Sequence, residues 1–181
     1  MWTGFIAELS PPNDFLDFAI FDDKIALRTA RLTISKAERP DAPALAVIWA
    51  DADVRRYLGG PISTDAALAR AVSRVAAGEL CVVRLLGNDR VIGCIAVEEM
   101  RPRELEISYL FIVEAWGCGY ATESVSAIID MLRGKFSGDE VFAKTQVANL
   151  PSRRLLERLE FFADQEVVEF GEPQTLYRRR L

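Results

Sequence analysis

The stretch that decides the fold is Trp116-Gly117-Cys118-Gly119-Tyr120-Ala121-Thr122-Glu123. It follows an apolar, strand-like run from Ile107 to Val113 and opens a segment with helical spacing. Two glycines at such a junction let the backbone approach another group closely and leave its N–H groups free. The first turn of a helix also has unpaired N–H donors and a partial positive charge. The stretch therefore predicts a phosphate-binding loop between a strand and a helix.

A second motif follows about one helix and one strand later. It reads Asn149-Leu150-Pro151-Ser152-Arg153-Arg154-Leu155-Leu156-Glu157-Arg158-Leu159-Glu160-Phe161. Its proline suits the first turn of a short helix. In this order, the two motifs indicate a protein that holds a pyrophosphate-containing cofactor and transfers the group that the cofactor carries.

Composition limits the chemistry. The 181 residues, 50% hydrophobic and 27% charged, are typical of one globular domain with a buried core. The chain has no histidine, which removes the usual Ser-His-Asp and Cys-His groups and the commonest zinc ligand. Cys81, Cys94 and Cys118 are too few and too scattered for a disulfide framework or a metal cluster. We therefore expect no metal.

Charge and hydropathy limit the partners. A net charge of −5 disfavours non-specific nucleic-acid binding and is compatible with a cationic substrate such as an amine. No apolar run approaches the roughly 20 residues of a membrane span, and the first residues lack the basic flank of a secretory signal. We expect a cytoplasmic protein that binds neither nucleic acid nor membranes.

The chain divides into an N-terminal extension, residues 1–26, and one domain, residues 27–181. In the extension, Phe15, Phe18 and Phe21 recur at helical spacing. We expect this stripe to pack on the domain or on a partner subunit in a homodimer.

Hydrophobic periodicity and turn signals predict six or seven strands and about four helices in the domain. The expected strands are Leu27 to Ala37, Leu80 to Leu86, Val91 to Val97, Glu104 to Val113, Val141 to Val147, Glu166 to Phe170 and Thr175 to Arg180. The expected helices are Asp41 to Trp49, Ser63 to Gly78, Gly119 to Phe136 and Pro151 to Leu159. Hairpin strands followed by strand–helix alternation favour an α+β (mixed α/β) fold with helices on the faces of a mixed sheet.

With these motifs the chain resembles the GCN5-related N-acetyltransferase (GNAT) superfamily, and within it the branch of the ribosomal-protein alanine N-acetyltransferases. The resemblance covers roughly residues 25–181 and is strongest from Trp116 to Glu123. The other matching segments are Leu27-Arg28-Thr29-Ala30-Arg31-Leu32, Asp53-Val54-Arg55-Arg56-Tyr57-Leu58, Val91-Ile92-Gly93, Ile107-Ser108-Tyr109, Asn149, Ser152 and Leu155-Leu156-Glu157. It implies a mostly antiparallel sheet that splays in the middle, near Phe111 to Val113.

The chain departs from the family pattern at four positions. The family usually has glycine where Ser108 and Glu160 stand, and proline where Val113 stands. The tyrosine that serves as general acid in many relatives is Leu156 here. Glu160 puts the turn after the second motif's helix in question, and Leu156 removes the phenol at that position.

The resemblance implies acetyl-CoA as co-substrate and a primary amine, on a small molecule or a peptide, as acceptor. Main-chain N–H groups of the Gly117–Thr122 loop would hold the pyrophosphate, Asn149 would bond the pantetheine arm, and Ser152 would lie near the sulfur. One arginine among residues 153, 154 and 158 could meet the 3′-phosphate. The residues implied for the cofactor are Phe111, Ile112, Val113, Trp116, Gly117, Cys118, Gly119, Tyr120, Ala121, Thr122, Asn149 and Ser152.

Amine acetylation also needs a base, because a free alkylamine has a pKa of ~10.4 and an N-terminal amine one of ~8. Without histidine, a carboxylate acting through water is the natural choice. Glu106 is the first candidate, and Glu98 and Glu99 are weaker ones. Ser152 could assist the departing thiolate, and a backbone N–H near Phe111 could stabilise the carbonyl oxygen. Structural roles for Glu106 and Ser152 stay open.

Two other functions also stay open. A CoA-binding sensor or scaffold with little or no transferase activity would contain the same two motifs. A different nucleotide-binding α/β protein would need its glycine-rich loop after an early strand of a repeated βαβ pattern. Here the loop follows the fourth expected strand, which argues against that class.

Overall fold

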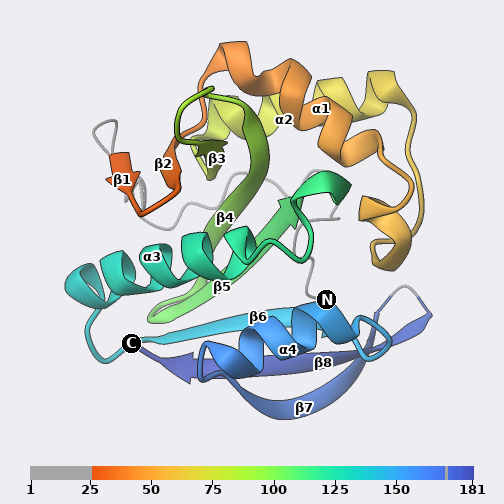
Figure 1. The fold of residues 1–181 in the computed structure, drawn as a ribbon. Coiled ribbons are helices and arrows are strands. Elements are labelled where there is room, and N and C mark those ends of the chain that lie inside the picture. Colours follow the sequence, from red (N-terminus) through yellow and green to blue (C-terminus); the bar gives the residue numbers. More distant parts are fainter. Residues whose placement is uncertain (1–25, 170) are drawn as a thin grey trace.

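A computed structural model describes residues 26–169 and 171–181, and in this part of the chain eight strands form one sheet with helices on both faces (Figure 1). The strands are β1 (Ala26–Arg28), β2 (Leu32–Lys36), β3 (Leu80–Leu85), β4 (Val91–Arg101), β5 (Glu104–Phe111), β6 (Glu140–Gln146), β7 (Phe162–Glu169) and β8 (Glu172–Arg180). The α-helices are α1 (Ala42–Ala50), α2 (Thr64–Ala77), α3 (Tyr120–Lys135) and α4 (Leu150–Arg158), and the 3-10 helices are η1 (Arg39–Asp41), η2 (Val54–Tyr57) and η3 (Val113–Ala115). The strand order is β1-β2-β3-β4-β5-β6-β8-β7, and each neighbouring pair is antiparallel except β5 and β6. The predicted fold class is confirmed.

The eighth strand arises from a turn at Thr29–Arg31. The N–H of Thr29 donates to the carbonyl of Leu32 at 3.0 Å. This turn folds the single strand that we expected from Leu27 to Ala37 into the antiparallel pair β1 and β2.

β7 begins at Phe162, four residues before the predicted start at Glu166, because it pairs with β8 from Phe162 onward. Its first four residues, Phe162-Ala163-Asp164-Gln165, are all exposed and do not alternate between apolar and polar. Residues 1–25 of the predicted N-terminal extension lie outside the described residues, and the packing of the extension stays a prediction.

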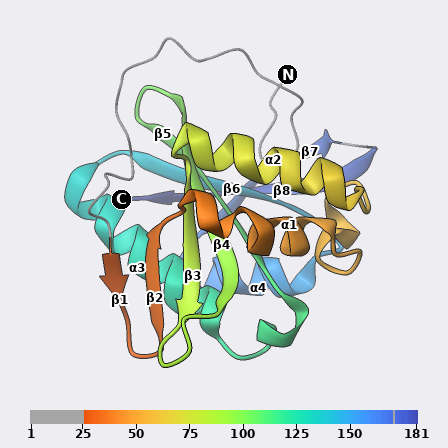
Figure 2. The ribbon, with the colours of Figure 1, turned by 90° about the horizontal axis from the view of Figure 1, so that it is seen from above.

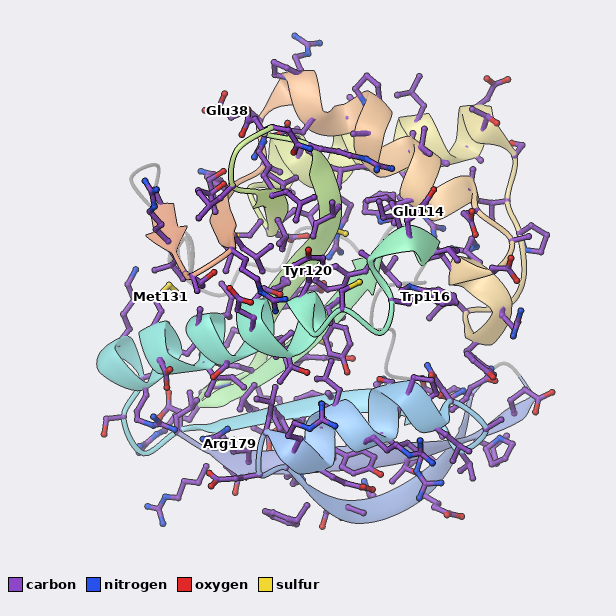
Figure 3. The ribbon with its side chains drawn as sticks, in the orientation of Figure 1. Glu38, Glu114, Trp116, Tyr120, Met131 and Arg179 are labelled. Atoms are coloured by element: carbon purple, nitrogen blue, oxygen red, sulfur yellow. The ribbon has the colours of Figure 1, made fainter. Side chains whose placement is uncertain are left out.

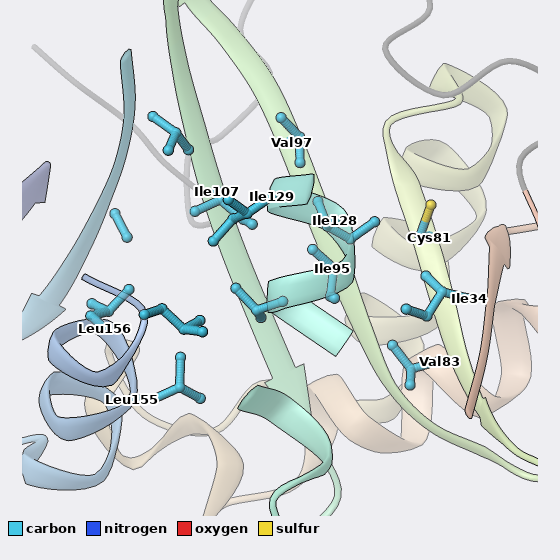
Figure 4. Packing of buried hydrophobic residues seen from close by; sticks show 14 of the residues in the cluster. Ile34, Cys81, Val83, Ile95, Val97, Ile107, Ile128, Ile129, Leu155 and Leu156 are labelled. Atoms are coloured by element: carbon cyan, nitrogen blue, oxygen red, sulfur yellow. The ribbon is translucent and has the colours of Figure 1, made fainter. Parts of the chain in front are cut away.

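Two apolar cores lie on the two faces of the sheet. α1 and α2 cover one face, and α3 and α4 cover the other (Figure 2). Alternation along β4 sends Ile95 and Val97 into the α3–α4 core, and Cys94 and Ala96 into the α1–α2 core. Figure 4 shows the α3–α4 core, in which side chains of β4 and β5 meet those of the two helices. The direction of each side chain along a central strand is thereby fixed.

Gly93 lets the end of β5 pack tightly against β4. Gly93 lies opposite Phe111 in the hairpin register. A Cβ added at Gly93 would lie 2.4 Å from Cδ1 of Phe111, closer than real Cβ contacts come. The position of the last residue of β5 therefore depends on this glycine.

The sheet splits between β5 and β6. The two strands pair only over Glu104–Glu106 and Glu140–Phe142. Beyond this pairing, β5 continues to Phe111 and β6 to Gln146, and Figure 1 shows the strands diverging. α3 and α4 both begin at the open end of the split (Figure 1). The predicted splay is confirmed, and it starts closer to the beginning of β5 than the resemblance implies.

The turn after α4 keeps the backbone conformation of a glycine although Glu160 occupies it. Glu160 has a φ of 61°. Its N–H donates to the carbonyl of Glu157, and the N–H of Phe161 donates to that of Leu156, each at 3.0 Å. These are the two bonds of a Schellman helix ending. A side chain in this left-handed region costs about 1–2 kcal/mol, so the departure affects the stability of the turn rather than its shape.

Candidate active site

A cavity of about 570 Å³ lies where β5 and β6 diverge, a volume typical of small-ligand sites. It is lined by residues of β5, the loop before α3, β6, α4 and η2. The predicted site residues that line it are Glu106, Phe111, Trp116, Gly117, Gly119, Ala121, Thr122, Asn149 and Ser152. Four other predicted residues do not line it: Ile112, Val113, Cys118 and Tyr120. The structure thus brings most of the predicted set together.

The loop before α3 offers unpaired backbone amides to the cavity. Gly117 and Gly119 have φ values of 73° and 80°, in the region that glycine adopts without a Cβ penalty. Within the described part of the chain, no carbonyl or side chain accepts a hydrogen bond from the N–H groups of Gly117 to Thr122. Together with the positive end of α3, these donors suit a diphosphate.

Trp116 fixes this loop to the end of β5. Its Nε1 donates to the carbonyl of Phe111 at 2.9 Å. Figure 3 shows Trp116 before α3 and Tyr120 in the first turn of the helix. Tyr120 packs half-buried against the α3–α4 core, and the thiol of Cys118 is exposed. Trp116 and Tyr120 thus hold the loop in place, and the backbone at Gly117 and Gly119 lines the cavity.

The N–H of Phe111 points into the split. The N–H of Ile112 donates to the carbonyl of Ile92 on β4 at 3.0 Å. Bonded positions alternate in an antiparallel ladder, so the N–H of Phe111 points away from β4. On that side β6 has already diverged. The Phe111 amide is therefore available to a ligand, whereas that of Ile112 is not.

On the α3–α4 face of the split, Tyr109 and Ser152 form a hydroxyl pair, with 2.8 Å between their oxygens. Burial raises the pKa of the Tyr109 phenol well above its ordinary value, although the bond to Ser152 opposes the shift. The phenol is therefore protonated at neutral pH. Asn149 caps α4, because its Oδ1 accepts from the N–H of Ser152 at 3.3 Å. Asn149 thus fixes the start of the helix that carries Ser152.

On the α1–α2 face, Glu106 is a buried carboxylate, 7% exposed. Its Oε2 has no hydrogen-bond partner among the described residues, and its Oε1 lies 3.9 Å from Nζ of Lys144. Lys144 is bonded to Glu169 at 2.8 Å. Burial raises the pKa of Glu106 from 4.5 to about 7, against the attraction of Lys144. A carboxylate with such a pKa can both accept and release a proton near neutral pH.

The hydroxyl pair and Glu106 lie on opposite faces because of strand alternation. Ile107 and Tyr109 pack in the α3–α4 core, and Leu110 packs in the α1–α2 core. Glu106 is an even number of residues from Leu110, so its side chain shares that face. The cavity, which both Glu106 and Tyr109 line, therefore passes through the sheet.

The two weaker candidates for the base have structural contacts and do not line the cavity. Glu98 pairs with Arg74 of α2. Glu99 accepts from the N–H of Arg103 at 3.4 Å, in the turn between β4 and β5. Their surroundings favour an anchoring role over proton transfer.

The three arginines of the second motif separate. Arg153 donates to the hydroxyl of Tyr177 at 3.1 Å and to the carbonyl of Val147 at 3.2 Å. Arg154 and Arg158 line the cavity. Of the three arginines, only Arg154 and Arg158 can therefore supply positive charge to a ligand in the cavity.

Our reading of the sequence missed Lys144, Glu169 and the hydroxyl of Tyr109. Lys144 is the single charged residue in the run from Val141 to Val147. A cation in a buried strand needs a buried anion nearby, and this signal could have led to the pair with Glu106. Glu169 comes from a distant strand, and no local pattern marks it.

The comparisons with known proteins agree with this architecture. A family model described as an acetyltransferase (GNAT) domain matches residues 31–162. The chain is 30% identical over 145 residues to the uncharacterized N-acetyltransferase p20 of Bacillus licheniformis, covering 75% of this chain and 81% of that protein. The chain belongs to the GNAT acetyltransferase family, and the predicted resemblance is confirmed.

Three solved structures share the fold. A GNAT-family acetyltransferase of Bacillus anthracis has a TM-score of 0.78 and 21% identity, covering 86% of this chain and 98% of that one. The ribosomal-protein-S5-alanine acetyltransferase of Vibrio fischeri has a TM-score of 0.70 and 14% identity, covering 87% and 97%. The protein yncA of Salmonella typhimurium, solved with its cofactor acetyl-CoA, has a TM-score of 0.65 and 22% identity, covering 82% and 93%.

No helix within residues 26–169 and 171–181 is both long and apolar enough to cross a membrane. In the same residues, no group of three or more His, Cys, Asp or Glu side chains is arranged to hold a metal ion. The cytoplasmic location, the absence of a metal and the homodimer stay predictions.

Proposed function

We propose that this acetyltransferase moves the acetyl group of acetyl-CoA to a primary amine by direct attack in a ternary complex. The observation that carries the proposal is the cavity through the split sheet. It has free amides and a hydroxyl pair on one face, and the buried carboxylate of Glu106 on the other. Two substrates can then enter from opposite faces and meet at the split.

The α3–α4 face suits the cofactor. The free N–H groups of Gly117 to Thr122 would hold the diphosphate, and Arg154 and Arg158 would add positive charge near the phosphates. The pantetheine arm would lie along β5, where this strand has no partner, within reach of Asn149. The Salmonella protein of the same fold was solved with acetyl-CoA, which supports this assignment. When bound, acetyl-CoA supplies an activated thioester.

The α1–α2 face suits the amine. Glu106 would accept the amine proton through a water molecule, and its pKa of about 7 keeps it largely ionised just above neutral pH. Lys144 keeps Glu169 as a partner whether or not Glu106 is charged. The acceptor would be a peptide N-terminus or a small-molecule amine.

The split itself supplies the remaining groups. The N–H of Phe111 would stabilise the negative charge that develops on the carbonyl oxygen when an amine attacks the thioester. As the carbon–sulfur bond breaks, Ser152 would donate a proton to the thiolate and regain one from Tyr109. Tyr109 thus returns a phenol to the site although Leu156 occupies the family's usual tyrosine position.

The test is an acceptor panel with acetyl-CoA, read by released thiol and by the mass of the product. The panel contains peptides with free N-termini, amino acids, polyamines and antibiotic amines. We expect at least one acceptor to release thiol in proportion to acetylated product. CoA binding without thiol release from any amine would instead identify a sensor or scaffold. No CoA binding in calorimetry at about millimolar ligand would overturn the cofactor assignment itself.

A further inference from the structure

The β1–β2 turn, Thr29–Arg31, contacts the first turn of α3 although it lies about 90 residues away in sequence. The guanidinium of Arg31 pairs with the carboxylate of Glu123, with Nε–Oε2 at 2.7 Å and Nη2–Oε2 at 2.6 Å. The N–H of Arg31 and the hydroxyl of Thr29 both donate to the other oxygen of Glu123, at 3.0 and 2.5 Å. Four donors from the turn therefore hold one carboxylate.

The same guanidinium also holds the loop before α3. Nη1 of Arg31 donates to the carbonyl of Cys118 at 3.0 Å, and the guanidinium lies 4.6 Å from the centroid of the Tyr120 ring. A Cβ added at Gly119 would lie 3.4 Å from Nη2 of Arg31. One side chain thus contacts the loop, the first helical residue and the acid of the first turn.

The contacts of Arg31 fix the direction in which the N–H of Gly119 points. In a trans peptide the C=O and the following N–H point in opposite directions. Because Arg31 holds the carbonyl of Cys118, the N–H of Gly119 must point away from Arg31. That N–H belongs to the free set that faces the cavity.

The contacts of Arg31 also offset the negative charge of Glu123. Hydrogen bonds from Thr29 and Arg31 lower the pKa of Glu123 against the effect of its partial burial, so the group stays ionised. An ionised carboxylate in the first turn of α3 would repel a diphosphate bound at the start of the same helix. The charge of Arg31 offsets this repulsion.

We propose that Arg31 is a positioning residue for the cofactor loop: it aims the Gly119 amide at the diphosphate and neutralises Glu123 beside it. The proposal rests on the proposed binding of acetyl-CoA by this loop. Arg31 itself acts through the loop and touches neither the thioester nor the amine.

The test compares two acetyl donors, acetyl-CoA and acetyl-pantetheine, which lacks the diphosphate. For Arg31→Gln we expect the KM and Kd for acetyl-CoA to rise about tenfold while kcat at saturation changes less than about twofold. With acetyl-pantetheine, kcat/KM should stay at the wild-type value. Arg31→Lys should recover part of the loss, because it keeps the charge without the planar fork. The double variant Arg31→Gln with Glu123→Gln should also recover part of the lost acetyl-CoA affinity, because the carboxylate that would repel the diphosphate is gone.

Arg28, exposed on β1, provides the matched control, and Arg28→Gln should change none of these values. Melting curves show whether each variant is folded, and Arg31→Lys serves if Arg31→Gln is not. The inference is overturned if both donors lose activity equally, if kcat falls instead of KM rising, or if the acetyl-CoA affinity changes less than about twofold. Failure of the proposed function looks different, because the wild-type chain itself would then show no CoA binding.

Discussion

Glu106→Gln should inactivate this protein and stabilise it at alkaline pH. Burial raises the pKa of Glu106 from 4.5 to about 7 in the folded chain. A carboxyl group with a raised folded-state pKa contributes stability that is present below its unfolded pKa and is lost as pH rises through the folded one. Well above pH 7, the buried charge therefore costs about 3 kcal/mol. Glutamine has nearly the same shape and no charge, so this cost disappears in the variant.

The effect on stability is measured as the difference between the unfolding free energies of variant and wild type, compared at two pH values. Relative to wild type, Glu106→Gln should gain about 2.5 kcal/mol more unfolding free energy at about pH 8.5 than at about pH 5. Any fixed cost of burying an amide cancels in this difference, because that cost does not depend on pH. Lys144 keeps its 2.8 Å bond to Glu169 and is not left unpaired. Urea unfolding of both chains at the two pH values gives the quantity.

The same substitution that stabilises the fold at alkaline pH should lower the acetyltransferase activity. With the best acceptor, we expect kcat/KM of the wild type to rise with pH through about 7, and Glu106→Gln to lose about a hundredfold or more. Glu99→Gln, near the end of the neighbouring strand β4, is the matched control. It should change neither kcat/KM nor the pH dependence of the unfolding free energy. Full activity of Glu106→Gln across pH would remove Glu106 as the base. An unfolding free-energy difference from wild type that is equal at both pH values would show that the carboxyl group titrates normally.

Three further predictions concern the cofactor face and the backbone. Tyr109→Phe should lower kcat about tenfold without raising the KM for acetyl-CoA, and adding it to Ser152→Ala should cost little more, because the two hydroxyls act as one unit. Glu160→Gly should raise the unfolding free energy by about 1 kcal/mol and the melting temperature by about 2–4 °C at unchanged activity, with Glu160→Ala, which keeps the strain, showing no such gain in a thermal melt. Gly119→Ala should weaken CoA binding in calorimetry, whereas Gly138→Ala, also at positive φ and with an arginine Nη2 3.5 Å from the added Cβ, should destabilise the fold without changing the affinity.

The sequence was enough to predict the local elements and the cofactor loop, because their signals are local. The glycines at 117 and 119 and the apolar face of α3 lie within one short window. The turn at Thr29–Arg31 was missed although Leu27 and Leu32 are five residues apart and so would face opposite sides of a single strand. Its role depends on Glu123, 92 residues beyond Arg31. Contacts between residues this far apart in the sequence depend on how the elements pack, and hydrophobic periodicity does not predict that packing.

The candidate catalytic groups, Glu106 and Tyr109, show the same limit although their partners are closer in the sequence. The place of Glu106 in β5 can be read from the sequence, but its raised pKa cannot, because it results from burial in the folded chain, against the attraction of Lys144 of β6. Tyr109 enters the sequence analysis only as part of the segment Ile107-Ser108-Tyr109, and its ring packs against the α3–α4 core. The Tyr109 hydroxyl finds its partner, Ser152, because the start of α4 lies beside β5 in the folded chain. Strand alternation predicts the face of a side chain, whereas its chemistry depends on what covers that face.

The split allows one strand to present the proposed base, Glu106, and the proposed acid, Tyr109, to a single reaction. In a closed sheet, the N–H of Phe111 would pair with β6 and the two faces would be sealed from each other. Because pairing stops after Glu106, the amide is free and the faces communicate. Glu106 and Tyr109 are three residues apart, which is about 10 Å along a strand. That span leaves room for a water between the carboxylate and the amine, and it keeps the base away from the departing thiolate. In the proposed mechanism, proton removal and proton supply would occur at opposite ends of the thioester, so that neither group would neutralise the other before the acetyl group has moved.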